Sequence, residues 1–163
     1  MDRSRKKKFI ECNSGRERIN LNGAYNPNNQ DVFIHEDESV NADSTIKLFQ
    51  KIEKAYLEKE VIYIFCDNAN YYRSKKVKEY LEKSKIILIF IPAYSPNLNL
   101  IERLWKFLRK KVINIKYYDK FEDFRNAVLR FFDNIHNYKD ELKKFIGFNF
   151  HIIYPEYPKT TLG

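Results

Sequence analysis

The sequence contains few cysteines and no long apolar segment. Its 163 residues include two cysteines, Cys12 and Cys66, which form no CxxC motif, so neither a cysteine metal site nor a disulfide framework is predicted. No apolar run approaches the roughly 18 residues of a transmembrane helix. The N-terminus, MDRSRKKKFIE, lacks the apolar region of a signal peptide. We therefore expect no contact with membranes and a cytoplasmic location.

The composition is that of a folded, basic protein. Hydrophobic residues make up 44% of the chain and aromatic residues 16%, which favours a packed core over disorder. Lysine and arginine exceed aspartate and glutamate by eight, which is compatible with a polyanionic partner such as nucleic acid. There is no internal repeat. We predict a basic tail over residues 1–15, one α/β domain over 16–150 and a C-terminal tail over 151–163.

The spacing of apolar residues predicts one antiparallel and one parallel pair of strands. Alternation over residues 16–25 and 31–36 predicts a hairpin. The apolar runs 61–66 and 86–91, joined by a basic helical segment at 73–84, predict a right-handed βαβ unit whose strands are buried on both faces. Further helices are expected through 46–56, with Ser39 or Asn41 as the N-cap, and at 98–112, 120–136 and 138–146.

Two carboxylates occupy positions where a metal site can form. Asp67 directly follows the first apolar strand, and Glu102 lies in the first turn of the helix after the second. Thirty-four residues separate them, which is enough for one crossover and a tight loop, so both can reach the strand ends where ligand sites gather. Two or three carboxylates suit Mg²⁺ or Mn²⁺, and such ions support phosphodiester chemistry.

Each of these residues also has a simpler structural interpretation. Asp67 can be a loop or capping residue, and Glu102 can complement the helix dipole. Lys106 and Arg109, on the same helix as Glu102, can be surface ion-pair partners. Trp105 is expected in the core. The scattered histidines are interpreted as structural: His35, His136 and His151.

Longer motifs carry a resemblance to a known family. The segments CDNANYY and PAYSPNLNLIERLWKFLRKK resemble the catalytic core of mariner-like DDE transposases, especially the bacterial insertion-sequence branch. Upstream, GRERINLNGAY and SVNADSTIKLF are similar to the family's second strand and first helix. The resemblance extends over residues 14–146. It implies an RNase H-like α/β fold of the retroviral-integrase type, with a five-stranded mixed sheet and flanking helices.

The resemblance also implies an activity and a site. Members of this family cut DNA at transposon ends and join the freed 3′-hydroxyl to target DNA, using Mg²⁺ or Mn²⁺ held by three acids. It makes Asp67 the second acid and Glu102 the third, both as metal ligands, with Asn68 in support. Tyr72 stands where many relatives have histidine. The remaining supporting residues are Tyr94, Ser95 and Pro96, in the loop that presents Glu102, together with Lys106 and Arg109.

The sequence departs from the family pattern near its start. No apolar strand ending in an acid precedes residue 16, and neither Asp2, Asp31 nor Asp37 has the context of the first acid. The family's helix-turn-helix module is not found either. We therefore expect the C-terminal part of a nucleoid-associated transposase, inactive and marginally stable alone because a central strand is missing. Its expected partners are DNA, an N-terminal transposase fragment and, as in full-length relatives, a second copy.

Two other functions compete with this interpretation. A non-catalytic transposase remnant would bind DNA through its basic surface without needing Asp67 or Glu102. A receiver-like phosphoacceptor domain would use Asp67 alone. The second alternative leaves the loop and helix match around Glu102 unexplained, and the sequence shows no acidic pair at an earlier strand end.

Overall fold

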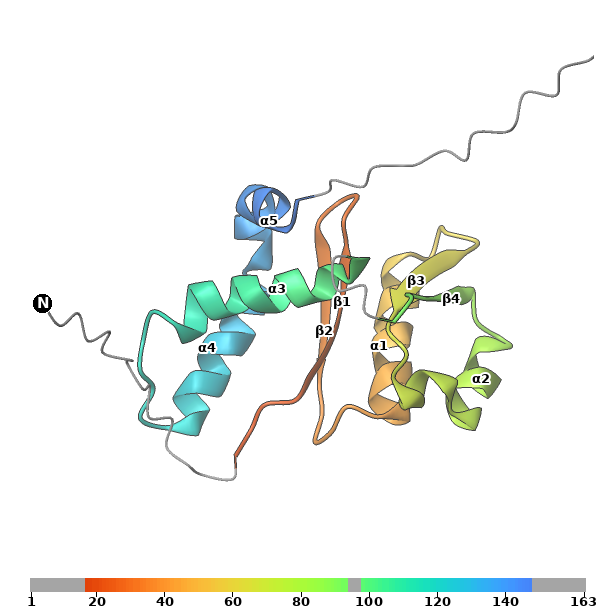
Figure 1. The fold of residues 1–163 in the computed structure, drawn as a ribbon, viewed down its shortest axis with the longest axis horizontal. Helices are drawn as coiled ribbons and strands as arrows, with labels where there is room; N and C mark the ends of the chain where they lie inside the picture. Colours follow the sequence, from red (N-terminus) through yellow and green to blue (C-terminus); the bar gives the residue numbers. More distant parts are fainter. Residues whose placement is uncertain (1–16, 94–97, 148–163) are drawn as a thin grey trace, which may run out of the picture.

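The computed structural model describes residues 17–93 and 98–147. In this part the chain is a mixed α/β protein with two small sheets and surrounding helices (Figure 1). The elements are the strands β1 (Leu21–Asn26), β2 (Asp31–Glu36), β3 (Ile62–Cys66) and β4 (Ile86–Phe90), the helices α1 (Ala42–Ala55), α2 (Lys75–Leu81), α3 (Leu100–Leu108), α4 (Phe121–Asp133) and α5 (Lys139–Ile146), the 3-10 helices η1 (Asn70–Arg73) and η4 (Ile135–Tyr138), and the π-helical turn η3 (Arg109–Ile113).

The predicted hairpin is confirmed, with a shorter first strand than expected. β1 pairs antiparallel with β2, from Leu21 opposite Glu36 to Asn26 opposite Asp31. The polar turn between them ends at Gln30, whose φ of 61° lies in the left-handed region. The Gln30 side chain donates a 2.8 Å hydrogen bond to the carbonyl of Pro27, which stabilises the turn locally.

The predicted parallel pair is confirmed, but its burial was predicted wrongly. β3 and β4 run parallel, from Ile62 beside Ile86 to Cys66 beside Phe90, and α2 lies between them in the chain. Alternate side chains on both strands point away from the core instead of being buried on both sides. The exposed fractions of these residues are Tyr63 60%, Phe65 63%, Ile87 47% and Ile89 37%. One face of this sheet therefore remains open to solvent.

Within the described residues the two sheets are separate. β1 pairs with β2 and β3 with β4, and no ladder joins the pairs in this part of the chain. Helix α1 connects them by packing on both. Asn22 of β1 donates a 3.2 Å hydrogen bond to Thr45 of α1, while Phe49 of α1 packs against Ile86 of β4. The shared helix, rather than a continuous sheet, holds the strand pairs together.

Helix α1 begins with a capping box. The Asn41 side chain accepts hydrogen bonds from the backbone of Asp43 at 2.9 Å and Ser44 at 3.0 Å, and the Ser44 hydroxyl accepts one from Asn41 N at 2.8 Å. These bonds satisfy donors that an isolated helix start leaves unpaired. Of the two predicted caps, Asn41 is therefore the one used.

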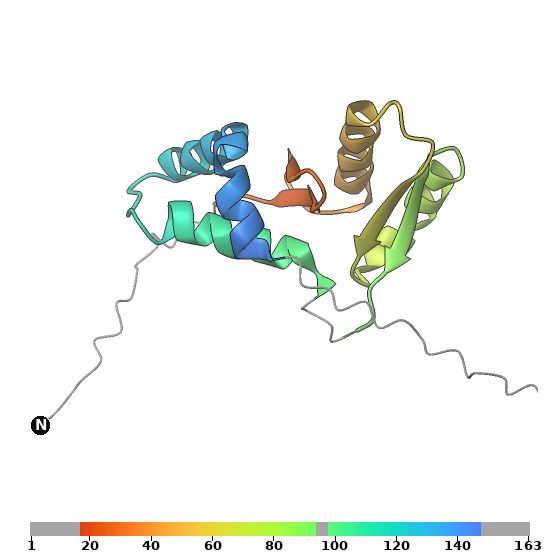
Figure 2. The same cartoon turned by 90° about the horizontal axis from the view of Figure 1, so that it is seen from above.

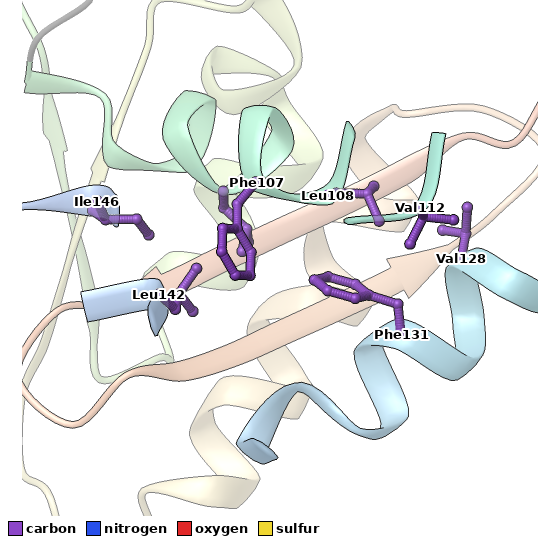
Figure 3. Close-up of a cluster of buried hydrophobic side chains, with 8 residues drawn as sticks. Phe107, Leu108, Val112, Val128, Phe131, Leu142 and Ile146 are labelled. Carbon is purple, nitrogen blue, oxygen red and sulfur yellow. The ribbon is translucent and has the colours of Figure 1, made fainter. Parts of the chain in front are cut away.

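Helices α3, α4 and α5 form the larger core with the hairpin. Their buried side chains meet between the helices (Figure 3), and the rings of Phe107 and Phe131 lie 6.0 Å apart. The eight buried residues are Leu104, Phe107, Leu108, Val112, Val128, Phe131, Leu142 and Ile146. We call β1, β2, α3, α4 and α5 the hairpin half, and β3, α2 and β4 with the face of α1 that covers them the crossover half; Figure 2 shows them on opposite sides of the molecule.

Close packing of α3 on β1 depends on a glycine. A Cβ atom at Gly23 would lie 2.8 Å from a ring carbon of Trp105 and 2.9 Å from Ile34 Cδ1, which is closer than side chains tolerate. Trp105 is therefore a core residue, as predicted. The predicted helix at 98–112 is interrupted, because regular α-helix ends at Leu108 and a π-helical turn brings Val112 into the core.

Among the residues that the structure describes, no helix combines the length and the apolar character required for a membrane span.

Candidate active site

Asp67 lies exposed at the carboxyl end of β3. It follows Cys66, which is buried at 4% exposure. Asp67 Oδ1 accepts a 3.0 Å hydrogen bond from Ala69 N, which turns the chain sharply after the strand. One carboxylate oxygen is thus held by the loop, and the group remains accessible to a ligand.

Asn68 ties the ends of the two parallel strands together. Its Nδ2 donates a 3.1 Å hydrogen bond to the carbonyl of Ile91, just beyond β4. Its Oδ1 accepts a 2.6 Å hydrogen bond from Arg73 Nη2. The Arg73 guanidinium lies over the ring of Phe90, with Cζ 4.1 Å from the ring centroid. Asn68 was predicted to support the site, whereas Arg73 was not predicted from the sequence, where it stands six positions after Asp67.

The charges at this strand end act on Cys66. Burial, followed by the Asp67 carboxylate, raises the pKa of the Cys66 thiol to about 11, against the opposing effect of the Arg73 guanidinium. The thiol is therefore protonated at neutral pH and unsuited to nucleophilic chemistry.

Tyr72 belongs to the apolar core beside the site. Its ring stacks on Phe49 with centroids 6.5 Å apart, and burial, followed by the neighbouring Tyr71, raises its pKa far above the usual value. Tyr72 therefore stays protonated at neutral pH. A residue held in this way supports the loop after β3 rather than accepting a proton.

Glu102 is exposed in the first turn of α3. Its backbone N donates a 3.2 Å hydrogen bond to the carbonyl of Asn99, which begins the helix. Lys106 lies one turn later and Arg109 follows the last residue of α3; both are exposed. In the described part of the chain neither forms a salt bridge with Glu102, so a local ion pair does not account for this carboxylate.

The amino end of α3 lies toward the edge where β3 and β4 end, as both overall views show (Figures 1 and 2). Asp67 and Glu102 therefore belong to elements whose ends face the same region. Across residues 17–93 and 98–147 no group of three or more histidine, cysteine or acidic side chains is placed to hold a metal ion. The loop residues Tyr94, Ser95 and Pro96 lie outside the described residues.

The acids of the hairpin have structural partners. Asp31 accepts a 2.8 Å hydrogen bond from the Tyr56 hydroxyl. Asp37 accepts a 2.7 Å hydrogen bond from Lys47 and lies 3.2 Å from His35, which gives that histidine the structural role predicted. Both carboxylates are engaged in holding the hairpin to α1.

The fold and site describe a mixed α/β protein that carries exposed acids at a strand end and at the start of a nearby helix. The sequence model of the DDE superfamily endonuclease family matches residues 2–125. The match takes in both acids, and the chain belongs to this family. No curated protein gives a significant match to the chain.

Proposed function

We propose that this chain is a catalytic module of a DDE transposase, of the mariner-like, bacterial insertion-sequence branch. Its reaction is cleavage of transposon-end DNA followed by joining of the 3′-hydroxyl to target DNA. The observation that carries the proposal is the family match across both acid-bearing segments, together with the exposed carboxylates of Asp67 and Glu102. Membership of an endonuclease family supports nuclease chemistry, and the mariner-like branch rests on the sequence motifs.

Asp67 and Glu102 are proposed as ligands of Mg²⁺ or Mn²⁺. Both are hard oxygen donors of the kind these ions prefer, and neither forms a salt bridge within the described residues. Divalent ions at such a site activate the attacking oxygen and stabilise the leaving oxygen of a phosphodiester. Asn68 contributes by fixing the end of β3 to the end of β4, which keeps the Asp67 loop in place.

We further propose that the first acid and its strand come from polypeptide outside the described residues. Two observations support this: β1 and β3 each have one pairing partner there, and no three-ligand metal group is found there. A strand inserted between β1 and β3 would join the two pairs into one RNase H-like sheet. It would also bring an acid beside Asp67. The described residues by themselves then supply two of the three acids.

Mn²⁺-dependent nicking of transposon-end DNA tests the proposal. The full chain is assayed with and without an added upstream transposase fragment, and Asp67→Asn and Glu102→Gln serve as inactive controls. We expect nicking only when the fragment is present and both acids are intact. Robust nicking by the chain alone would show that the third acid is already present. No nicking under any condition would count against the transposase proposal.

A DNA-binding remnant without catalysis is the second candidate, favoured by the net charge of +8. Electrostatic DNA binding falls steeply as salt rises. A remnant would bind DNA equally well with Asp67→Asn or Glu102→Gln and would gain no nicking activity from the upstream fragment. The nicking assay therefore separates the two candidates.

A further inference from the structure

Arg73 is held in place by two different contacts at the end of the parallel strand pair. Asn68 Oδ1 accepts a 2.6 Å hydrogen bond from its Nη2, and the Phe90 ring lies 4.1 Å beneath its Cζ atom. Asn68 is itself fixed by the carbonyl of Ile91. A long, exposed arginine normally samples many rotamers, so this arrangement removes conformational freedom before any ligand arrives.

Most of the hydrogen-bonding capacity of Arg73 is unused in the described part of the chain. A guanidinium carries five N–H donors, and within residues 17–93 and 98–147 it donates to Asn68 and forms no salt bridge. The aromatic ring covers one flat face of the group. The remaining donors lie along its edge, which is the geometry that binds phosphate or carboxylate oxygens in pairs.

The neighbouring acid does not neutralise this cation. Asp67 directs one oxygen to Ala69 N and forms no salt bridge with Arg73 in the described residues, although both charges act on Cys66. This arrangement suits a ligand with two neighbouring features: an anionic oxygen that Arg73 can bind, and a reacting centre that lies close to Asp67. A nucleic-acid backbone presents phosphates at regular intervals and meets this requirement.

We propose that Arg73 is a phosphate-binding residue of the Asp67 site, oriented by Asn68 and Phe90 to hold the DNA backbone next to the acid. This inference rests on the proposed function, because it takes DNA as the ligand. In this proposal Arg73 positions the DNA backbone. The carboxylates of Asp67 and Glu102 hold the metal ions that act on the reacting phosphate. Within the proposed reaction, Asn68 then has two roles, fixing the strand ends and orienting the arginine.

The test measures DNA binding by the full chain without divalent metal, using a labelled duplex oligonucleotide over a range of salt concentrations. Arg73→Gln is expected to weaken binding about tenfold, as for loss of a charge-assisted hydrogen bond, and to lower the slope of log K against log salt by about 0.9. Arg73→Lys keeps the charge, so its slope should equal that of the unaltered chain. Its affinity should still fall, since lysine lacks the paired donors and the stacking face.

Lys54→Gln is the matched control. Lys54 is an exposed cation on α1, next to Glu53, which accepts a hydrogen bond from Lys85 N at the start of β4. It therefore lies at the opposite end of the strands from Asp67. Its removal lowers the net charge by the same amount as Arg73→Gln, and we expect the DNA affinity to change less than twofold.

The outcomes distinguish this inference from the proposed function. An unaltered chain that binds no DNA even at low salt overturns both. DNA binding that Arg73→Gln leaves unchanged, or reduces no more than Lys54→Gln does, overturns the inference alone. If circular dichroism shows that Arg73→Gln is unfolded, Arg73→Lys decides: lower affinity at an unchanged slope supports the inference, and unchanged affinity overturns it.

Discussion

The two acids lie in halves of the molecule that are packed very differently. Glu102 belongs to the hairpin half, whose core contains eight buried apolar residues between three helices and the hairpin. Asp67 belongs to the crossover half, where three buried residues, Phe49, Val77 and Ile86, form the corresponding cluster. The outer face of the β3–β4 sheet exposes large apolar side chains, with Phe65 at 63%. The hairpin half has the larger buried core, and the crossover half leaves one face of its sheet exposed.

This difference bears on how the proposed two-acid site would be assembled. Buried apolar area is the main source of stability, so we infer that the hairpin half holds its shape more firmly. The crossover half depends on α1 and on whatever covers its open face. Variation in the position of Asp67 relative to Glu102 is therefore expected to come mainly from the crossover half. An additional strand or partner that orders the crossover half would also order the proposed site.

The largest expected difference comes from matched phenylalanine substitutions in the two halves. Phe107 is fully buried, so Phe107→Ala should lower the free energy of unfolding by about 3–5 kcal/mol. Phe65 is mostly exposed, so Phe65→Ala should change it by less than about 0.5 kcal/mol. Urea unfolding followed by circular dichroism measures both. Equal losses would show that the open face of the crossover half is covered in solution.

The contact between α3 and β1 is tested by adding a single methyl group. Gly23→Ala places a Cβ against the Trp105 ring and should cost about 1–3 kcal/mol through overpacking. In a Trp105→Leu background the contact with the indole ring is removed and that with Ile34 Cδ1 remains, so the cost of the added methyl should shrink. Thermal unfolding of the four proteins gives the coupling between the two positions. Additive effects would mean that the Trp105 ring does not rest on Gly23.

Helix α1 is the element that both halves share, and its cap tests that role. Asn41→Ala removes hydrogen bonds to the backbone of Asp43 and Ser44 and should cost about 1 kcal/mol. Ser39→Ala is the control. In the described residues the Ser39 hydroxyl hydrogen-bonds to the Asn41 side chain and not to the helix backbone. Hydrogen exchange should show faster opening in both halves. A change confined to one half would contradict the connecting role of α1.

The open face of the crossover half should bind apolar dyes. Phe65 and Ile89 lie opposite each other across the parallel pair and both are exposed. Replacing both by threonine retains β-branched or strand-favouring character and should reduce dye fluorescence and self-association while leaving the unfolding midpoint nearly unchanged. Unaltered dye binding would place the exposed apolar surface elsewhere.

The smallest expected effect is a pH dependence of the stability, caused by Asp37 near the start of α1. A hydrogen bond from Lys47, followed by those from Glu38 N and His35, lowers the pKa of Asp37 from 3.8 to about 2. Because the folded pKa is depressed, the contribution to stability is complete above about pH 4 and is lost as the pH falls toward 2. Lys47→Met should weaken this acid dependence, as measured by thermal unfolding between pH 2 and about 5. An identical pH profile in Lys47→Met would show that Lys47 does not shift Asp37.

Much of the local structure was predictable from the sequence. Alternation and a polar turn predicted the hairpin, and two apolar runs flanking a helical segment predicted the parallel pair, because side-chain periodicity reflects backbone geometry. The positions of Asp67 after a strand and Glu102 at a helix start were predicted on the same basis. The burial of β3 and β4 was not, because an apolar run does not reveal whether a second layer exists to cover it.

The sequence by itself therefore determined the elements, the places of the two acids and the family to which the chain belongs, since local spacing and motifs carry this information. Tertiary structure alone decided that α1 is shared by two separate strand pairs and that one sheet face is open. It also decided that Arg73 rests on Phe90 and bonds to Asn68. These features depend on which strand ends lie next to each other in space. Pairing between segments that are distant in the sequence determines this arrangement.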